Sequence, residues 1–300
     1  MAVGSSLLLH IDEIPDWSLP IWREAMLGVD WLRLRASRVY YGLGIPRGDK
    51  SPVVVIPGFM GHDCYLLELY LWLWRIGYKP YMSKIGQNAE CPNILIERLL
   101  ATIDRAYEDT GKPVHLIGHS LGGVLALGAA SLNREVVGRI ITLGSPIRGP
   151  RVHPFVLRNA QLVRNRIRRN KHRRPAHKPF EEDCFTYGCA CGFACSVIEN
   201  LPKDVPHLAV YTRSDGIVDW KASQTGDKKR DAEVAGTHIG LVWNAEVYRL
   251  IAGTLACGQE TKKRRTTATP GHRAHAGNGN LVAGPLRKTF SGGRANPRAG

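Results

Sequence analysis

The stretch VHLIGHSLGG, residues 114–123, decides the fold of this chain. It opens with a short apolar run, typical of a strand buried on both faces of a sheet, and leads into Leu121–Leu132, which is small and apolar all round. Between them lies Gly118-His119-Ser120-Leu121-Gly122, a G-x-S-x-G sequence in the context of a strand-to-helix turn. The sequence therefore predicts a strand, a tight turn with a serine at its apex, and a helix packed on a sheet.

The turn also predicts a reactive serine. Side chains two positions either side of Ser120 would clash in so tight a turn, and Gly118 and Gly122 remove those clashes. The hydroxyl would lie over the N-terminus of the following helix, where the helix dipole and free N–H groups favour an oxyanion. We predict that Ser120 is a nucleophile. The alternative is a glycine-rich packing turn whose serine has no role.

A serine hydroxyl is a weak nucleophile at neutral pH, so we expect a base and a carboxylate that orients it. After a turn of this kind they follow in the order acid, then histidine. Seven histidines follow the serine: His153, His172, His177, His207, His238, His272 and His275. His238 is favoured, because its AGTHIG loop lies between the last predicted strand and the final helix. The alternative is a loop histidine bonded to the backbone.

Asp215 is the predicted acid. It follows the predicted strand His207–Thr212 in the sequence SDGIVDW, near the carboxyl end where parallel sheets gather their sites. Gly216 would permit a sharp turn just after the carboxylate. Asp219, four residues on, is the rival, and a turn-forming Asp-Gly pair is the alternative without a function.

Two backbone N–H groups are expected to bind an oxyanion. One is the N–H of Leu121, directly after the serine, and the other belongs to a loop after an earlier strand. The sequence PGFMG at residues 57–61 follows the predicted strand Val53–Ile56. We expect the N–H of Phe59 as this donor, with Met60 as the second choice. An ordinary strand-to-helix turn is the alternative.

Strand and helix patterns alternate along most of the chain. The predicted strands are 51–57, 79–85, 114–118, 136–143, 207–212 and 233–235. The predicted helices are 15–41, 65–76, 93–107, 121–132 and 244–256. This alternation predicts an α/β fold with a mostly parallel sheet and helices on both faces.

The chain has 300 residues, 44% of them hydrophobic, enough for one large core. We expect an N-terminal helical lead-in at 1–48, an α/β domain at 49–257 with a cap inserted at about 146–204, and a basic disordered tail at 258–300. In the lead-in, apolar residues recur near a helical period: Trp17, Ile21, Trp22, Met26, Val29, Leu32 and Leu34. We expect this stripe to pack on the domain, with a membrane-surface helix as the alternative.

The net charge of +15 comes from two segments. Residues 148–178 hold eleven Lys/Arg and no acidic residue, and residues 258–300 hold nine Lys/Arg and one Glu. A basic run is usually a solvated face, so a nucleic-acid partner is not expected. The chain shows neither a convincing signal peptide nor an apolar run long enough to span a bilayer, which predicts a cytoplasmic protein. The basic half of the insertion would suit contact with an acidic lipid surface.

Cysteines do not indicate a metal site. Of seven, four cluster as Cys184, Cys189, Cys191 and Cys195, at a spacing that is not typical of zinc binding. Free thiols are the expected state, with a local disulfide as the alternative.

Five segments together resemble one family: PGFMG, VHLIGHSLGG, ITLGSP, YTRSDGIVDW and GTHIGLVWN. They are similar to the bacterial lipase and esterase branch of the α/β-hydrolases, over residues 50–256. The resemblance implies a Ser120–Asp215–His238 triad, no metal or other cofactor, and a mobile cap. Pro57 departs from the pattern, because many relatives have histidine there, and we expect it to alter the pocket rim. The long basic insertion is a second departure.

The sequence thus predicts a serine hydrolase that cleaves carboxylic esters through an acyl-enzyme, with a small-molecule or lipid ester as substrate. Two alternatives stay open. One is an acyltransferase on the same triad, which would exclude water and admit another acceptor. The other is a non-catalytic homologue that binds lipid or a partner, since fold alone does not give function.

Overall fold

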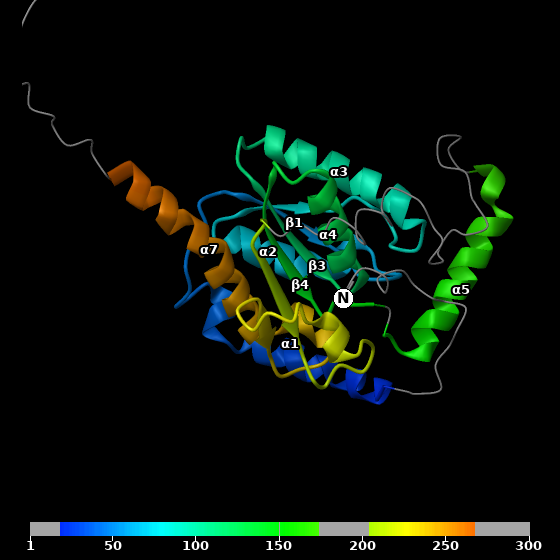
Figure 1. Cartoon of the computed structure of the whole chain (residues 1–300). Helices are drawn as coiled ribbons and strands as arrows, with labels where there is room; N and C mark the ends of the chain where they lie inside the picture. The colour runs from blue at the N-terminus through cyan, green and yellow to red at the C-terminus, as the bar shows by residue number, and fades with distance from the viewer. Residues whose placement is uncertain (1–18, 150, 174–203, 268–300) are drawn as a thin grey trace, which may run out of the picture.

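Six parallel strands form the centre of the computed structural model, which describes residues 19–149, 151–173 and 204–267 (Figure 1). The strands are β1 (Pro52–Ile56), β2 (Lys79–Met82), β3 (Val114–His119), β4 (Val137–Leu143), β5 (His207–Tyr211) and β6 (Asp231–Glu233). The α-helices are α1 (Leu27–Arg35), α2 (Leu67–Arg75), α3 (Pro92–Glu108), α4 (Leu121–Leu132), α5 (Pro154–Arg169) and α7 (Ala245–Thr267). Short 3-10 helices are η2 (Ile21–Met26), η3 (Arg38–Tyr41), η4 (Asp63–Leu66), η5 (Lys171–Arg173), η6 (Trp220–Ser223) and η7 (Ile239–Trp243).

The sheet has the strand order β2-β1-β3-β4-β5-β6, and each neighbouring pair is parallel. Ile56 of β1 lies beside Gly118 of β3, which in turn lies beside Thr142 of β4. The α/β fold with a parallel sheet, predicted from the alternation, is confirmed. Because the strands run the same way, their carboxyl ends share one edge, and the loops after β1, β3, β5 and β6 gather there.

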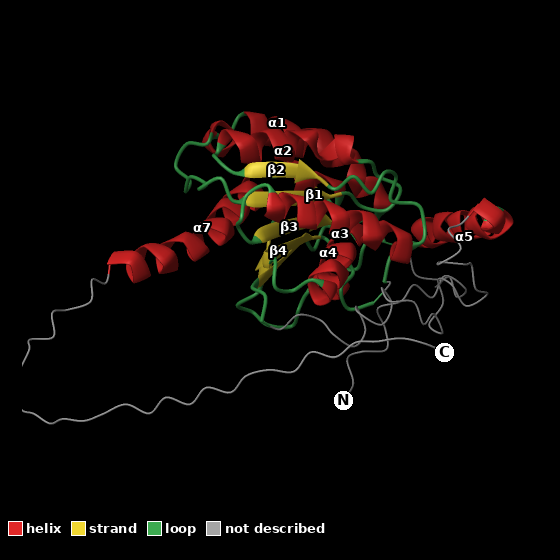
Figure 2. Ribbon diagram, turned by 90° about the horizontal axis from the view of Figure 1, so that it is seen from above, coloured by secondary structure: helices red, strands yellow, loops and turns green. Residues whose placement is uncertain are grey.

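Helices cover both faces of this sheet, so every residue of β1 is buried. Val54 and Ile56 face a core that includes residues of α3 and α4. Val53 and Val55 face the other core, which includes residues of α2 and α7. Figure 2 shows α1 and α2 together on one side of the sheet and α3 and α4 on the other. The β-branched run is therefore buried from both sides.

The N-terminal segment packs only partly as predicted, because Leu34 is buried in the core while most other described members of the apolar stripe are exposed. Trp22 is 71% exposed, and Ile21, Met26 and Leu32 are also exposed, so the expected apolar contact is wrong for these residues. The buried side chains on η2 and α1 include the carboxylates of Glu24 and Asp30. They are buried because the surface beneath them consists of backbone N–H groups that bond to carboxylates. Trp17 lies outside the described residues.

Helix α5 lies at the periphery of the molecule (Figures 1 and 2). Its buried side chains recur at helical spacing: Leu157, Ala160, Val163 and Ile167. Phe59, from the loop after β1, packs against both clusters to which these residues belong. α5 belongs to the segment predicted to be a cap. Residues 174–203, which hold the four clustered cysteines, lie outside the described part of the chain.

Two element boundaries differ from the predicted ones. β6 covers Asp231–Glu233, slightly before the predicted strand at 233–235. α7 continues past Ala256 to Thr267, so the segment expected to be disordered from Gly258 begins with helical backbone. Among the described helices, none combines the length and the apolar composition that crossing a membrane requires.

Candidate active site

Ser120 lies at the apex of the turn between β3 and α4, with φ of 51° and ψ of −127°. A positive φ is costly for a residue with a side chain, by about 1–3 kcal/mol, and is held only where the surroundings enforce it. A Cβ on Gly118 would overlap the backbone of Gly122 and Gly123, and one on Gly122 would overlap the carbonyls of Ile56 and Pro57. The predicted need for both glycines has this physical origin.

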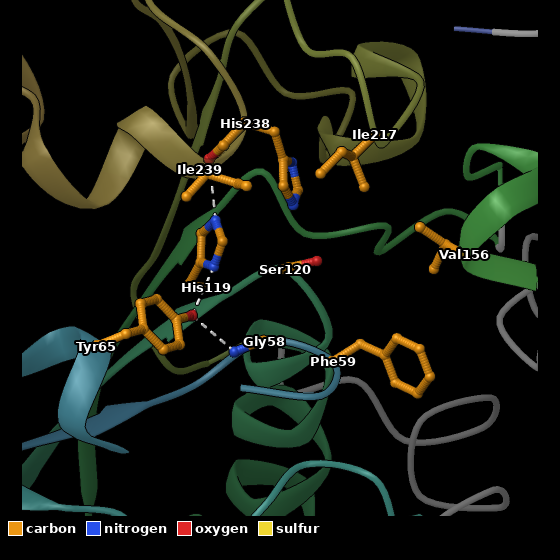
Figure 3. A pocket seen from close by; sticks show the side chains of 9 residues that line it. All are labelled: Gly58, Phe59, Tyr65, His119, Ser120, Val156, Ile217, His238 and Ile239. Atoms are coloured by element: carbon orange, nitrogen blue, oxygen red, sulfur yellow. Dashed lines mark hydrogen bonds between the residues drawn. The ribbon is translucent and has the colours of Figure 1, made fainter. Parts of the chain in front are cut away.

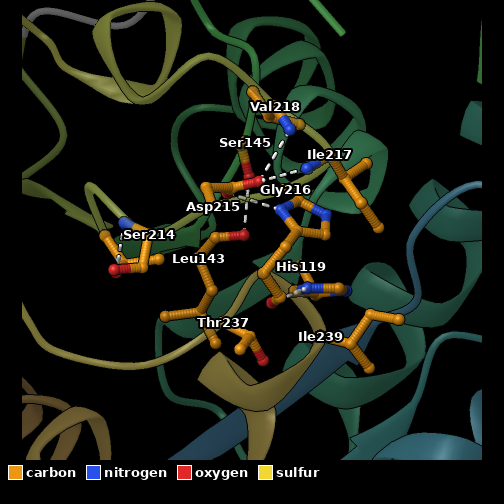
Figure 4. Close-up of polar contacts among 12 residues, drawn as sticks. His119, Leu143, Ser145, Ser214, Asp215, Gly216, Ile217, Val218, Thr237 and Ile239 are labelled. Carbon is orange, nitrogen blue, oxygen red and sulfur yellow. Dashed lines mark hydrogen bonds and ion pairs between the residues drawn. The ribbon is translucent and has the colours of Figure 1, made fainter. Parts of the chain in front are cut away.

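Asp215 and His238, which come from different loops, form a buried hydrogen-bonded pair. The distance between Asp215 Oδ2 and His238 Nδ1 is 2.7 Å, and their side chains are 1% and 3% exposed. Asp215 Oδ1 accepts the N–H groups of Ile217 at 2.8 Å and Val218 at 2.7 Å (Figure 4). Two backbone N–H groups of its own loop thus hold the carboxylate in the orientation in which it contacts the imidazole.

The rival acid lies elsewhere. Asp219 Oδ1 accepts the N–H of Lys221, and its Oδ2 lies 3.4 Å from Arg151 Nη1. Gly216 lies at a bend just after the carboxylate, with a φ that is not positive. A Cβ there would lie 2.7 Å from the carbonyl oxygen of Pro20. The glycine therefore admits the N-terminal segment against the loop that carries Asp215.

Other candidate histidines have structural contacts. His153 Nδ1 accepts the N–H of Phe155 at the start of α5. His207 bonds to Thr142 Oγ1 at 2.9 Å through its Nε2. His172 lies in η5, and His177, His272 and His275 lie outside the described residues. Of the described histidines, His238 is the one paired with Asp215.

Ser120 and His238 line the same pocket, whose volume is about 250 Å³ (Figure 3). Its other lining residues are Gly58, Phe59, Tyr65, His119, Val156, Ile217 and Ile239. Ser120 Oγ and His238 Nε2 do not form a hydrogen bond in the described part of the chain. Such contacts often tighten only when the substrate binds. Pro57 is buried and is not among the residues that line this pocket.

The N–H of Phe59, in the loop after β1, has no partner among the described residues. The N–H of Gly58 bonds to Tyr65 Oη at 2.8 Å, and that of Met60 bonds to the carbonyl of Asn88 at 2.8 Å. The N–H of Phe59 has no such acceptor, and neither has that of Leu121 at the start of α4. The N–H of Met60 is therefore engaged within the protein, whereas the N–H groups of Phe59 and Leu121 are available to another acceptor.

A chain of hydrogen bonds that the sequence did not predict runs beneath Ser120. His119 Nε2 lies 3.0 Å from the carbonyl oxygen of His238, so this nitrogen must carry a proton. Burial, together with the charge of His238, lowers the pKa of His119 to about 3, so the ring is neutral and its Nδ1 accepts. Tyr65 Oη, 2.7 Å away, donates to Nδ1 and accepts from Gly58 (Figure 3). This chain links the loop after β1 to the His238 loop.

The pKa of His238 is raised above its ordinary value. Burial of the ring lowers this pKa, but the charge and hydrogen bond of Asp215 outweigh that effect, with a smaller contribution from the charge of Glu24. Since Nδ1–H points to the carboxylate, the neutral ring carries its lone pair on Nε2. The pair can therefore accept a proton at Nε2 and stabilise the resulting imidazolium.

These features are typical of hydrolases that use a serine nucleophile. They comprise a parallel sheet, a strained serine turn, a buried Asp–His pair and two N–H groups without partners at the same edge. The model of the alpha/beta hydrolase family matches residues 21–245, and the chain belongs to this family.

Two curated relatives are each described as a triacylglycerol lipase. The one from Burkholderia plantarii is 28% identical over 149 residues, which are 47% of this chain and 41% of that protein. The one from Pseudarthrobacter phenanthrenivorans is 32% identical over 116 residues, 36% of each chain. The chain thus spans less than half the length of these relatives. Among solved structures, Est1E from Butyrivibrio proteoclasticus is similar with a TM-score of 0.44 and 18% identity, over 73% of this chain and 92% of that one.

Proposed function

We propose that this protein hydrolyses carboxylic esters, with Ser120 as the nucleophile, His238 as the base and Asp215 as the orienting acid. One observation supports the proposal above all. The buried Asp215–His238 pair shares a small pocket with a serine whose backbone is held at positive φ. The buried pair and a serine at the apex of a strand-to-helix turn are both what a serine nucleophile requires.

The reaction follows from the arrangement of these groups. His238 Nε2 takes the proton of Ser120 as the hydroxyl oxygen attacks the ester carbonyl carbon. The N–H groups of Phe59 and Leu121 bind the oxyanion of the tetrahedral intermediate. The imidazolium then gives its proton to the leaving alcohol, and an acyl-enzyme forms on Ser120. Water, deprotonated by the same histidine, releases the acid and restores the serine.

We propose an ester with an apolar acyl group as the substrate class. Four apolar side chains line the pocket around the serine: Phe59, Val156, Ile217 and Ile239. The lining contains no Asp, Glu, Lys or Arg side chain, so an acyl chain meets mostly hydrocarbon. The two relatives described as triacylglycerol lipases are consistent with this class.

Contact with an acidic lipid surface through α5 is part of the proposal. The helix carries five arginines and no acidic residue between Pro154 and Arg169, and Phe155 and Leu162 are exposed on it. Basic charge combined with exposed apolar side chains favours binding at an anionic membrane surface. Val156 of the same helix lines the pocket, so this contact would place the site near its substrate. Sedimentation with phosphatidylglycerol vesicles tests it, and a Phe155→Ser, Leu162→Ser variant that sediments as the wild type does would refute it.

The catalytic proposal is tested by Ser120→Ala with p-nitrophenyl butyrate as substrate. We expect no turnover above background, no labelling by a fluorophosphonate probe and an unchanged thermal midpoint. Wild-type turnover in this variant would remove Ser120 from the mechanism. A wild-type protein that neither turns over the ester nor takes the label would instead support a non-catalytic homologue. Product analysis with added alcohol separates hydrolysis from acyl transfer.

A further inference from the structure

Glu24 lies in η2, far from the serine in sequence, yet the residue is only 7% exposed and its carboxylate bonds to the loops of the candidate site. Oε1 accepts the N–H of Gly216 at 3.1 Å and the N–H of His238 at 3.0 Å. Oε2 accepts the N–H of Ile239 at 2.9 Å. A single buried carboxylate is thus held by three backbone donors from two loops.

These donors lie directly beside the Asp215–His238 pair. Gly216 follows Asp215 in the chain, and the second donor is the backbone of His238 itself. The distance between the carboxylate and the imidazole therefore depends on two loops that Glu24 fastens together. We propose that Glu24 is a positioning residue, whose carboxylate keeps the Asp215 loop and the His238 loop at the separation that the reaction requires. This inference rests on the proposed function.

The packing around Glu24 supports a fixed attachment. The carbonyl of Pro20 would lie 2.7 Å from a Cβ on Gly216, so the N-terminal segment is seated directly on the Asp215 loop. Asp30, on α1, makes a second attachment, because its Oδ2 accepts the N–H of Thr237 at 3.3 Å. A Cβ on Gly240 would overlap that same carboxylate. The His238 loop is thus held on both sides of the histidine.

Charge gives Glu24 a second effect that a purely structural contact would not have. The groups around the His238 ring are Asp215 at Nδ1, Glu24 at the backbone, and His119, whose ring centroid lies 4.8 Å away. His119 is neutral at pH 7, because its pKa is lowered to about 3 by burial and by the charge of His238. The negative charge of Glu24 raises the pKa of His238, although less than Asp215 does. Removing this charge should lower that pKa.

The test compares three variants with the wild type in kcat/KM for p-nitrophenyl butyrate against pH. Glu24→Gln keeps the length of the side chain, removes the charge and turns an NH2 group toward at least one of the three N–H donors. Glu24→Asp keeps the charge and shortens the side chain, and Asp30→Asn removes the neighbouring buried carboxylate. We expect Glu24→Gln to lower kcat/KM about tenfold or more, as small misplacements of catalytic groups do. Its acidic limb should move to lower pH, because the imidazolium loses a stabilising charge.

The other two variants separate charge from geometry. Glu24→Asp should lose kcat/KM while its acidic limb stays at the wild-type pH. Asp30→Asn should lower the thermal midpoint and leave the acidic limb in place, since its charge is not among those that raise the pKa of His238. If Glu24→Gln does not fold, a Glu24→Asp variant with wild-type kcat/KM overturns the inference, and a loss at an unchanged acidic limb supports it.

Three further results overturn the inference. One is a folded Glu24→Gln variant with wild-type kcat/KM and acidic limb. Another is a loss of activity that matches only the loss of folded protein, measured by circular dichroism in the same samples. The third is an Asp30→Asn variant whose acidic limb shifts as far as that of Glu24→Gln. Ser120→Ala, assayed in parallel, separates the two proposals, because turnover in that variant refutes the proposed function itself.

Discussion

Replacing Asp215 with asparagine tests the core of the mechanism with little change in shape. Oδ1 accepts two backbone N–H groups, from Ile217 and Val218, so the amide oxygen of the asparagine must take that place. The opposite orientation would set an NH2 group against two buried donors, at about 1–3 kcal/mol for each unsatisfied group. The NH2 group therefore faces His238 Nδ1 and donates to it.

This change reverses the tautomer of His238. Its Nδ1 becomes an acceptor, so the ring proton moves to Nε2, and the lone pair that should receive the proton of Ser120 is lost. For a buried aspartate of this kind the loss in rate is about 10⁴-fold, or about 5.5 kcal/mol in the transition state. The folded state changes less, because a charge-assisted hydrogen bond is replaced by a neutral one, at about 1–2 kcal/mol.

The assay is kcat/KM for p-nitrophenyl butyrate, with the thermal midpoint measured on the same preparation. Asp219→Asn is the matched control, since Asp219 pairs with the exposed Arg151 and caps η6. We expect this control to stay within about threefold of the wild type, as for an exposed ion pair. A folded Asp215→Asn variant within tenfold of the wild type, or an Asp219→Asn variant that loses as much, would refute the reasoning.

Three further predictions follow from the same geometry. The pKa of His238 lies above its ordinary value of 6.5, so kcat/KM should fall tenfold per pH unit on the acidic side, with a midpoint above 6.5. A midpoint below 6.5 would contradict the effect of Asp215 on this pKa. The stabilisation from this raised pKa is present at low pH and is lost as the pH rises through the folded-state value. Tyr65→Phe leaves the buried N–H of Gly58 without its acceptor, so we expect the free energy of unfolding in urea to fall by about 1–3 kcal/mol and kcat to fall with it. Unchanged values would show that the link from Tyr65 to His119 has no effect. Gly122→Ala places a Cβ against the carbonyl oxygens of Ile56 and Pro57, so we expect little folded protein by circular dichroism. A stable and active variant would show that the turn can relax around the added methyl group.

Much of the candidate site could be predicted from the sequence because its signals are local. The apolar run of β3, the glycines at 118 and 122 and the apolar α4 determine a strand, a turn and a helix within a few residues of one another. The parallel sheet follows from alternation, and chain order then directs attention to Asp215 and His238. Closeness to a strand end favours Asp215 over Asp219, and the structure pairs Asp215 with the histidine.

Tertiary structure alone decided which face of the N-terminal segment is buried. Apolar periodicity predicts the buried face only when the surface beneath it is apolar, as it is for Leu34. The surface beneath Glu24 instead presents backbone N–H groups of two loops. Glu24 and Asp30 meet those loops across separations of roughly two hundred residues, which no local pattern encodes. The same holds for the link from Tyr65 through His119 to the His238 carbonyl, because hydrogen bonds depend on distances that exist only after folding. The sequence by itself thus determined the strand, the turn and the order of the polar groups, and the fold decided which buried carboxylates hold them in place.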